Sequence, residues 1–424
     1  MEEAGVLELD EAAHSLLDGA SGRAMQLAMR LVVRAADIMG AERLRPISFA
    51  HVDACFYTGQ AHVDFISYML ENGARLSVPT WTNNGVVSLD DPSLRPYAED
   101  PVTAAGAAGL MRLYARLGCK PTWTCAPYQH GGGPGFGDHI AVGESNAVAY
   151  YNSVVGARTN KYGDYLDVAC ALTGLAPDAG LHRDEGRKAQ LHCDASGISE
   201  SWRRQDIFAH LLGHHVGRMA GRRVPVISGL LAPANDALKA ISSAAASSGG
   251  VELWHGVGVT PEAPDLGAVF TGAESHRLTP GDLARAHRQL STARDGPLDA
   301  VALGTPHFSL SEFAELVRLL DGRRVKPGLL FLVSTSRVVR ELAAAKGWIA
   351  SLISSGIEIP VDVCTYYAPR ARGLKGRVMT NAAKWAYYAP GMLGVEVAFG
   401  SLRECVESAV RGEVWRDPDL WTSA

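Results

Sequence analysis

Hydrophobic residues in the second half of the chain fall into short runs rich in β-branched side chains, separated by longer stretches with helical periodicity. The runs are "RRVPVISGLL", "GGVELWHGVGVT", "LDAVALGTPHFSL", "PGLLFLVST" and "IEIPVDVCTYYAP". Between them, Asn235–Ala245, Ser311–Leu320 and Arg337–Ser355 are predicted helices. This alternation predicts an α/β fold with parallel-rich sheets covered by helices. Ligands of such sheets bind beyond the carboxyl ends of the strands, where "GTPH" and "DVCTYY" fall.

The first half of the chain begins with an amphipathic helix predicted around Ser21–Met39. It then mixes short strands, "RPISFAHVD" and "ARLSVPTWTN", with helices and glycine-rich loops. No internal repeat is found, and the small-residue stretch "AISSAAASSGG" is predicted to end a helix and form a turn.

Composition and charge exclude several classes of protein. The 424 residues are 47% hydrophobic and 20% charged, with a formal net charge of -5 and both signs mixed along the chain. A phosphate-tracking basic face is therefore not expected, which excludes a nucleic-acid partner. No apolar run approaches the roughly 18–20 residues that a membrane span needs, and the charges of residues 1–10 do not suit a secretion signal. These features predict a cytoplasmic protein that does not enter a membrane.

Cysteine usage and the absence of standard motifs restrict which covalent links, cofactors and metal sites are expected. The seven cysteines are odd in number, scattered and never in a CxxC pair, so a disulfide framework is not expected. "GGGPGFG" lacks the Lys-Ser/Thr of a phosphate loop and the spacing of a dinucleotide fingerprint, so no nucleotide cofactor is expected. His214 and His215 are neighbours, about 100° apart on a helix, and would not readily share one metal ion.

Residues 143–167, "GESNAVAYYNSVVGARTNKYGDYLD", carry an unusual density of polar side chains interleaved with apolar ones. Such a segment is either a solvated loop or a partly buried one, whose polar groups must be paired or offered to a ligand. We favour a ligand site. Arg158 is the best carboxylate clamp, although a structural ion pair with Asp164 or Asp167 is a close alternative. The other substrate-binding candidates in the segment are Glu144, Ser145, Asn146, Asn152, Ser153, Thr159 and Asn160.

Four residues are candidates for proton transfer. His51 and Asp53 form an i, i+2 pair on one strand face, suited either to a proton relay or to a hydrogen-bonded core pair. Lys161 and Lys384 are anion contacts, and either would serve as a base if burial depressed its pKa. Tyr388 completes the candidate catalytic set.

Several motifs together resemble the large, catalytic part of aconitase X enzymes. They are "DGASGRAMQLAMRL", "AHVDACFYTG", "VPTWTN", "TCAPY", "ESNAVAYYNSVVGARTNKYGDYLD", "GLHRDEGR", "HGVGVTPEAP" and "VMTNAAKWAYYAPGMLG", in the family's order. The resemblance implies aconitase-like domains one to three, with an N-terminal α/β region over residues 1–204, a C-terminal one over 205–424, and no swivelling domain. It implies a hydro-lyase that removes water from a hydroxy-acid such as cis-3-hydroxy-L-proline or mevalonate 5-phosphate. A small swivelling-domain subunit is the implied partner.

The resemblance also implies an iron site. The family holds an iron-sulfur cluster with cysteines of "TCAP", "GCPH" and "DTC" motifs, whose positions here are Cys125, Thr305 and Cys364. Because a hydroxyl is a poor soft ligand, Thr305 argues against the usual cluster, and His307 is the nearest substitute ligand. In the C-terminal motif, Thr380 and Asn381 are implied substrate contacts.

Two further departures fall in that C-terminal motif. Ala382-Ala383 stands where relatives have Ser-Gly, and Tyr387 stands where they tend to have His. Three hypotheses therefore stay open: a family-type dehydratase, a repurposed lyase or isomerase with a mononuclear metal or none, and a catalytically silent subunit that binds a partner.

Overall fold

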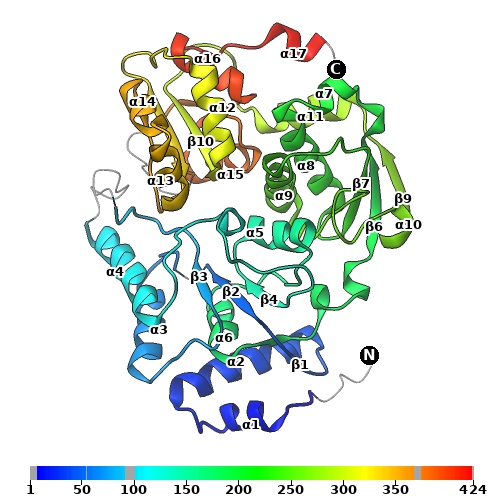
Figure 1. The fold of residues 1–424 in the computed structure, drawn as a ribbon, viewed down its shortest axis with the longest axis vertical. Helices are drawn as coiled ribbons and strands as arrows, with labels where there is room; N and C mark the ends of the chain where they lie inside the picture. The colour runs from blue at the N-terminus through cyan, green and yellow to red at the C-terminus, as the bar shows by residue number, and fades with distance from the viewer. Residues whose placement is uncertain (1–6, 54, 91–100, 367–373, 423–424) are drawn as a thin grey trace.

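The computed structural model describes residues 7–53, 55–90, 101–366 and 374–422. Three parallel sheets, each covered by helices, form three parts of the molecule (Figure 1). The predicted α/β class is confirmed. Within the described residues, no helix is long and apolar enough to span a bilayer.

The first sheet is small and has three parallel strands in the order β3-β2-β4. Amphipathic helix α2 buries Ala24, Ala28 and Val32 in a core that it shares with α3, α4 and α6. The predicted helix around Ser21–Met39 is thus confirmed. The bounds of the elements in this part are α1 Glu11–Leu17, α2 Arg23–Met39, β1 Leu44–Pro46, β2 Phe49–Val52, α3 Gln60–Glu71, β3 Thr80–Thr82, α4 Pro101–Leu117, β4 Ile140–Val142, α5 Ser145–Tyr150, α6 Leu166–Thr173 and β5 Leu175–Pro177, with a π-helical turn at Tyr151–Val155.

The second sheet has four parallel strands in the order β8-β7-β6-β9. Helices α8 and α9 pack closely against each other, because Gly213 and Gly217 of α8 face the backbone of α9 at Ile241 and Ala245. A Cβ at Gly217 would lie 2.6 Å from the Ala245 carbonyl oxygen. The elements are β6 Ala189–Asp194, α7 Glu200–Arg203, α8 Asp206–Ala220, β7 Pro225–Ser228, α9 Asn235–Gly249, β8 His255–Gly256, α10 Leu266–Val269, β9 Phe270–Arg277 and α11 Pro280–Leu290.

The third sheet has five parallel strands in the order β12-β11-β10-β13-β14. Its central strand β10 is buried along its whole length, as its continuous apolar run predicts. One helix was expected over Arg337–Ser355, but the chain forms two, because Gly347 adopts a left-handed conformation with φ 77°. The elements are β10 Ala300–Phe308, α12 Leu310–Leu320, β11 Leu330–Thr335, α13 Arg337–Ala345, α14 Trp348–Ser354, β12 Ile357–Glu358, β13 Arg377–Thr380, α15 Ala383–Leu393, β14 Glu396–Phe399, α16 Leu402–Arg411 and α17 Pro418–Thr422.

The first and third sheets meet at the ends where their strands finish. The backbone N–H of Gly85, just after β3, donates to the Asp362 carbonyl oxygen, just after β12, at 2.8 Å. Two side-chain contacts cross the same junction, between Cys125 and Cys364 and between Glu144 and Lys384. The carboxyl ends of two parallel sheets therefore face one another, which is where ligands of such sheets bind.

Candidate active site

A cavity of about 300 Å³ lies at this junction. Asp53, Asn83 and Glu144 line it, and they follow the ends of β2, β3 and β4 closely. The ends of three neighbouring parallel strands thus place three polar side chains in the same cavity. The remaining lining residues are Phe56, Ser145, Lys161, Asp164, Tyr366, Lys384, Tyr388 and Met392.

A buried ion pair between Glu144 and Lys384 forms the floor of the cavity. Glu144 caps helix α5 and accepts from the backbone N–H of Asn146 at 2.9 Å and from Asn83 Nδ2 at 3.2 Å. Burial alone would raise the pKa of Glu144, but the Lys384 ammonium and these hydrogen bonds outweigh it and lower the pKa to about 2. Burial likewise opposes the charge of Lys384, but Glu144 dominates and raises the pKa of the lysine. Both groups are therefore ionised at neutral pH, and Lys384 lacks the depressed pKa that a base would need.

Asp53 is the carboxyl group in this cavity whose pKa lies near neutrality. Burial, followed by the negative charge of Glu144, raises the pKa of Asp53 to about 7. Its Oδ1 accepts from Asn83 Nδ2 at 2.5 Å, and its backbone N–H donates to Asp167 Oδ2 at 2.6 Å. A carboxyl group held in this way can exchange a proton with a ligand at physiological pH.

The other wall of the cavity is aromatic. Tyr366 and Tyr388 stack with ring centroids 5.4 Å apart, and Lys384 Nζ lies 6.0 Å from the centre of the Tyr366 ring. Burial raises the pKa of Tyr388, so its hydroxyl stays protonated and can donate a hydrogen bond. Lys161 also lines the cavity and is exposed, so its ammonium can meet an anion.

Two cysteines and a histidine come together next to the cavity. Cys125 Sγ and Cys364 Sγ lie 3.3 Å apart, and the ligand atoms of Cys125, Cys364 and His307 all lie within 4.8 Å of one another. Cys125 and Glu144 are linked through Asn146, whose Nδ2 donates to the Cys125 carbonyl oxygen at 2.8 Å. Metal–sulfur bonds of about 2.3 Å allow both sulfurs to bind one ion at this separation. The donor set suits a transition metal.

His307 and Thr305 lie near the end of β10, where the His307 backbone N–H donates to Cys125 Sγ at 3.3 Å. His307 Nε2 donates to the Val363 carbonyl oxygen at 2.9 Å, so Nδ1, 2.9 Å from Thr124 Oγ1, carries the lone pair that a metal would take. Burial lowers the pKa of His307 to about 4, which keeps the ring neutral. The hydroxyl of Thr305 is buried without a hydrogen-bond partner among the described residues.

Arg158 does not line this cavity. Its guanidinium forms an ion pair of 2.5 Å with Asp184 and donates to the His182 carbonyl oxygen at 3.2 Å. The sequence alternative of a structural ion pair is the arrangement found, with Asp184 in place of Asp164 or Asp167. Lys161, unlike Arg158, lines the cavity.

Most of the other polar residues of 143–167 hold the segment itself in place. Asn152 Nδ2 donates to the carbonyl oxygens of Thr159 and Glu252, and Ser153 Oγ accepts from the Trp254 backbone N–H. Thr159 Oγ1 and Asn160 Nδ2 also donate to backbone carbonyl oxygens. These four predicted substrate contacts are buried away from the cavity, whereas Glu144, Ser145 and Lys161 are the predicted site residues of this segment that line it.

Three further predicted residues lie in the core beside the site. His51 Nε2 donates to the Thr124 carbonyl oxygen at 3.0 Å, and burial lowers the pKa of its ring to about 4. Thr380 Oγ1 accepts from the Ala382 backbone N–H at 3.1 Å, which shapes the turn before α15, and Asn381 follows it. None of the three lines the cavity.

Asn83 and Tyr366 are site residues that sequence reasoning missed. Asn83 bridges the carboxyl groups of Asp53 and Glu144, and Tyr366 provides the aromatic wall. Both residues could have been predicted from the sequence, because "VPTWTN" and "DVCTYY" end or follow predicted strands. Their place at strand carboxyl ends was the signal that could have identified them.

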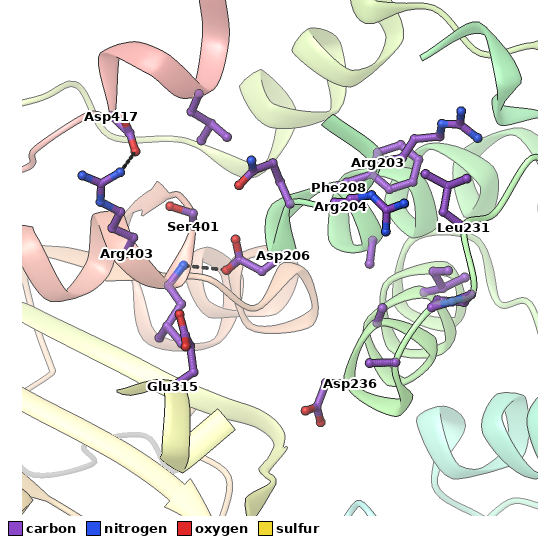
Figure 2. A pocket seen from close by; sticks show the side chains of 18 of the residues that line it. Arg203, Arg204, Asp206, Phe208, Leu231, Asp236, Glu315, Ser401, Arg403 and Asp417 are labelled. Carbon is purple, nitrogen blue, oxygen red and sulfur yellow. Dashed lines mark hydrogen bonds and ion pairs between the residues drawn. The ribbon is translucent and has the colours of Figure 1, made fainter. Parts of the chain in front are cut away.

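A larger cavity, of about 700 Å³, lies between the second and third sheets (Figure 2). Some of its charged groups already have partners: Arg403 pairs with Asp417 at 2.7 Å, and Asp206 accepts from the Leu402 backbone N–H at 2.7 Å. None of the predicted site residues lines it. The smaller cavity, with its converging ionised groups, is the candidate active site.

Comparison with known proteins settles the family. Sequence profiles of the aconitase X first, second and third domains match residues 6–185, 189–288 and 298–411, each containing one of the three parallel sheets. This chain belongs to the aconitase X family. The resemblance drawn from the motifs is thereby confirmed, while the division into regions 1–204 and 205–424 stays a prediction.

Individual relatives agree with this assignment. The chain is 42% identical to a cis-3-hydroxy-L-proline dehydratase of Pseudomonas aeruginosa, over 98% of this chain and 72% of the relative. It is 34% identical to a phosphomevalonate dehydratase large subunit of Methanothermobacter thermautotrophicus, over 93% of this chain and 97% of the relative. The holo-form of Thermococcus kodakaraensis aconitase X superimposes with a TM-score of 0.84 at 30% identity, covering 95% of this chain and 100% of that one. Both sequence relatives are dehydratases, and dehydratases are hydro-lyases.

The Glu144–Lys384 pair generates a stability prediction. Lys384→Met leaves a buried carboxylate unpaired, so we expect unfolding free energy to fall by about 3–5 kcal/mol at pH 7. The double variant Glu144→Gln/Lys384→Met removes both charges and should recover most of that loss. Denaturant unfolding of the three proteins measures this, and a double variant no more stable than Lys384→Met would contradict it.

Proposed function

We propose that the chain is the large, catalytic component of a hydro-lyase that removes water from cis-3-hydroxy-L-proline or a close cyclic hydroxy amino acid. Support comes from the charges of the cavity. Its described lining holds three carboxyl groups, of Asp53, Glu144 and Asp164, and two ammonium groups, of Lys161 and Lys384. A zwitterion offers a carboxylate to Lys161 and an ammonium to the acidic side. The higher identity to the hydroxyproline dehydratase points the same way.

The reaction breaks the Cα–H bond and the C3–O bond of the substrate. The Cα proton passes to a base, its electron pair forms the Cα–C3 double bond, and the hydroxyl leaves as water after taking up a proton. We assign the proton transfer at Cα to the carboxylate of Asp53, since its pKa of about 7 suits both uptake and release. Tyr388 donates a hydrogen bond to the substrate, and Lys161 holds its carboxylate.

Cys125, Cys364 and His307 would hold a metal ion. Such an ion, when bound, acts as a Lewis acid that stabilises the oxygen of the departing hydroxyl. We propose a single ion of iron or a similar metal rather than a three-thiolate cluster, since two thiols and a histidine form the described group. A small swivelling-domain subunit is the proposed partner, because the chain covers 97% of a relative named a large subunit.

A direct test is turnover of cis-3-hydroxy-L-proline by the purified chain, alone and with a swivelling-domain subunit, in iron-containing anaerobic buffer. We expect loss of one water and formation of a pyrroline carboxylate, followed by NMR. Mevalonate 5-phosphate serves as the comparison substrate and should not react. Turnover of the phosphate ester alone would overturn the substrate proposal, and no turnover of either compound under all conditions would favour a silent subunit.

Asp53 makes the rate depend on pH. Because the carboxylate must be ionised to accept the proton, kcat/KM should fall as the pH drops below about 7. Asp53→Asn should lower kcat by about 10²–10⁴-fold and abolish that limb of the profile.

Asp53→Asn should have the opposite effect on stability: it should lower activity but stabilise the folded protein at alkaline pH. Because the pKa of Asp53 is raised in the folded protein, its contribution to stability is lost as the pH rises from about 4 through 7. Asp53→Asn should therefore be more stable than the wild type at pH 8, by thermal unfolding. A variant that loses activity and stability together would assign Asp53 a structural role instead.

Substitution of Thr305 tests whether the active site holds a single metal ion or an iron-sulfur cluster. Anaerobic reconstitution with iron and sulfide should leave the wild type without acid-labile sulfide, since a hydroxyl does not replace a thiolate. Thr305→Cys should gain bound sulfide and a brown colour, whereas the matched Thr305→Ser should not. Stoichiometric sulfide in the wild type would contradict the proposal of a single ion.

A further inference from the structure

A second group of metal-ligating side chains lies in the second sheet's part of the molecule. His215, His276 and Asp282 each place one ligand atom within 4.8 Å of the others. They come from three elements: α8, the end of β9, and the first turn of α11, which packs beside α8 (Figure 1). None of them lines the candidate active site or belongs to its sulfur-containing group.

His215 gives the strongest indication that this group binds a ligand. Its side chain points from α8 into the interior, where only 8% of the residue is exposed, and its Nε2 has no hydrogen-bond partner among the described residues. A buried ring nitrogen without a partner costs free energy unless a water or an ion satisfies it. The His276 ring lies 5.3 Å from the His215 ring, between centroids.

His276 and Asp282 already form the other half of a ligand set. His276 Nε2 lies 3.0 Å from Asp282 Oδ2, a separation that two donors bound to one ion also have when bonds are about 2.0–2.2 Å long. Asp282 is held in place by Thr279, whose N–H and hydroxyl donate to Oδ2 at 3.0 and 2.7 Å in the capping box of α11. A carboxylate oriented by such hydrogen bonds is a preorganised metal ligand.

We propose that His215, His276 and Asp282 bind one divalent transition-metal ion of the Zn²⁺ class. Two imidazoles and a carboxylate are borderline donors that suit Zn²⁺, Co²⁺ or Ni²⁺. The His276 side chain is one-third exposed, so a fourth position is open to water or a small anion. Binding ties α8 to the β9–α11 connection, and an ion bound only by the folded state stabilises it.

The neighbouring histidine provides a matched control. His214 is the preceding residue of α8, but its Nε2 bonds Gln289 Oε1 at 3.0 Å and it does not belong to the group. His214→Ala and His215→Ala thus truncate the same side chain on the same helix, one outside and one inside the proposed site.

Cobalt titration of the full chain, followed by visible absorption, tests the proposal. The double variant Cys125→Ser/Cys364→Ser, which lacks the active-site thiols, should bind one equivalent of Co²⁺ with d–d bands and no sulfur-to-cobalt charge-transfer band, and the further substitutions are made in this background. His215→Ala should weaken cobalt binding by about tenfold or more, while His214→Ala should not. In the same thiol-free background, Zn²⁺ should raise the thermal midpoint of the parent protein and of its His214→Ala derivative, and leave that of its His215→Ala derivative unchanged.

Two further variants keep the test decisive if His215→Ala fails to fold. His276→Gln alters a side chain that is one-third exposed, and Asp282→Asn keeps an oxygen for the cap of α11; both should lose cobalt binding. In the thiol-free background, either unchanged cobalt binding in these variants or no cobalt binding before they are introduced would overturn the proposal.

Discussion

The buried ion pair between Glu144 and Lys384 is the constraint on which the rest of the site depends. It joins the carboxyl end of the first sheet to the first turn of α15, the helix that follows strand β13 of the third sheet. Two charges that are almost fully buried are stable only as partners, so the two parts of the molecule cannot separate here without leaving one charge unpaired. The same pair fixes the electrostatics of the cavity, because the charge of Glu144 helps to keep the pKa of Asp53 near 7.

The sulfur-containing group depends on the same junction. Cys125 comes from the first part of the chain and Cys364 from the third, so their 3.3 Å separation exists only when the two sheets face each other. Asn146 connects this group to the ion pair, since its backbone N–H contacts Glu144 and its side chain contacts the Cys125 carbonyl oxygen. In the proposed mechanism, this junction would hold the proton-transfer carboxyl group and the metal ligands next to each other, so that the reaction can take place at two adjacent carbon atoms.

Much of the fold could be predicted from the sequence, and the failures have physical reasons. Continuous apolar runs identified β7, β10 and β11, and α9 and α12 begin within one residue of their predicted starts. Strand β9, "FTGAESHR", was missed because five of its eight residues are polar, as suits the edge position next to β6. A single helix was predicted across Gly347 because the periodicity of apolar residues continues on both sides of it. The chain breaks the helix there because Gly347 adopts a left-handed backbone conformation, which glycine favours.

The site was predicted less completely, and the polar segment 143–167 shows why. Its density of polar residues was a true sign of burial, but a buried irregular segment must first satisfy its own backbone groups. Asn152, Ser153 and Asn160 do that, with bonds to backbone atoms of Thr159, Trp254 and Ala179. The residues that line the cavity differ from these structural residues in their position relative to a strand end. Glu144 and Ser145 follow β4 directly and line the cavity. Composition therefore locates a buried polar region, whereas the topology of the sheet decides which of its side chains reach a ligand.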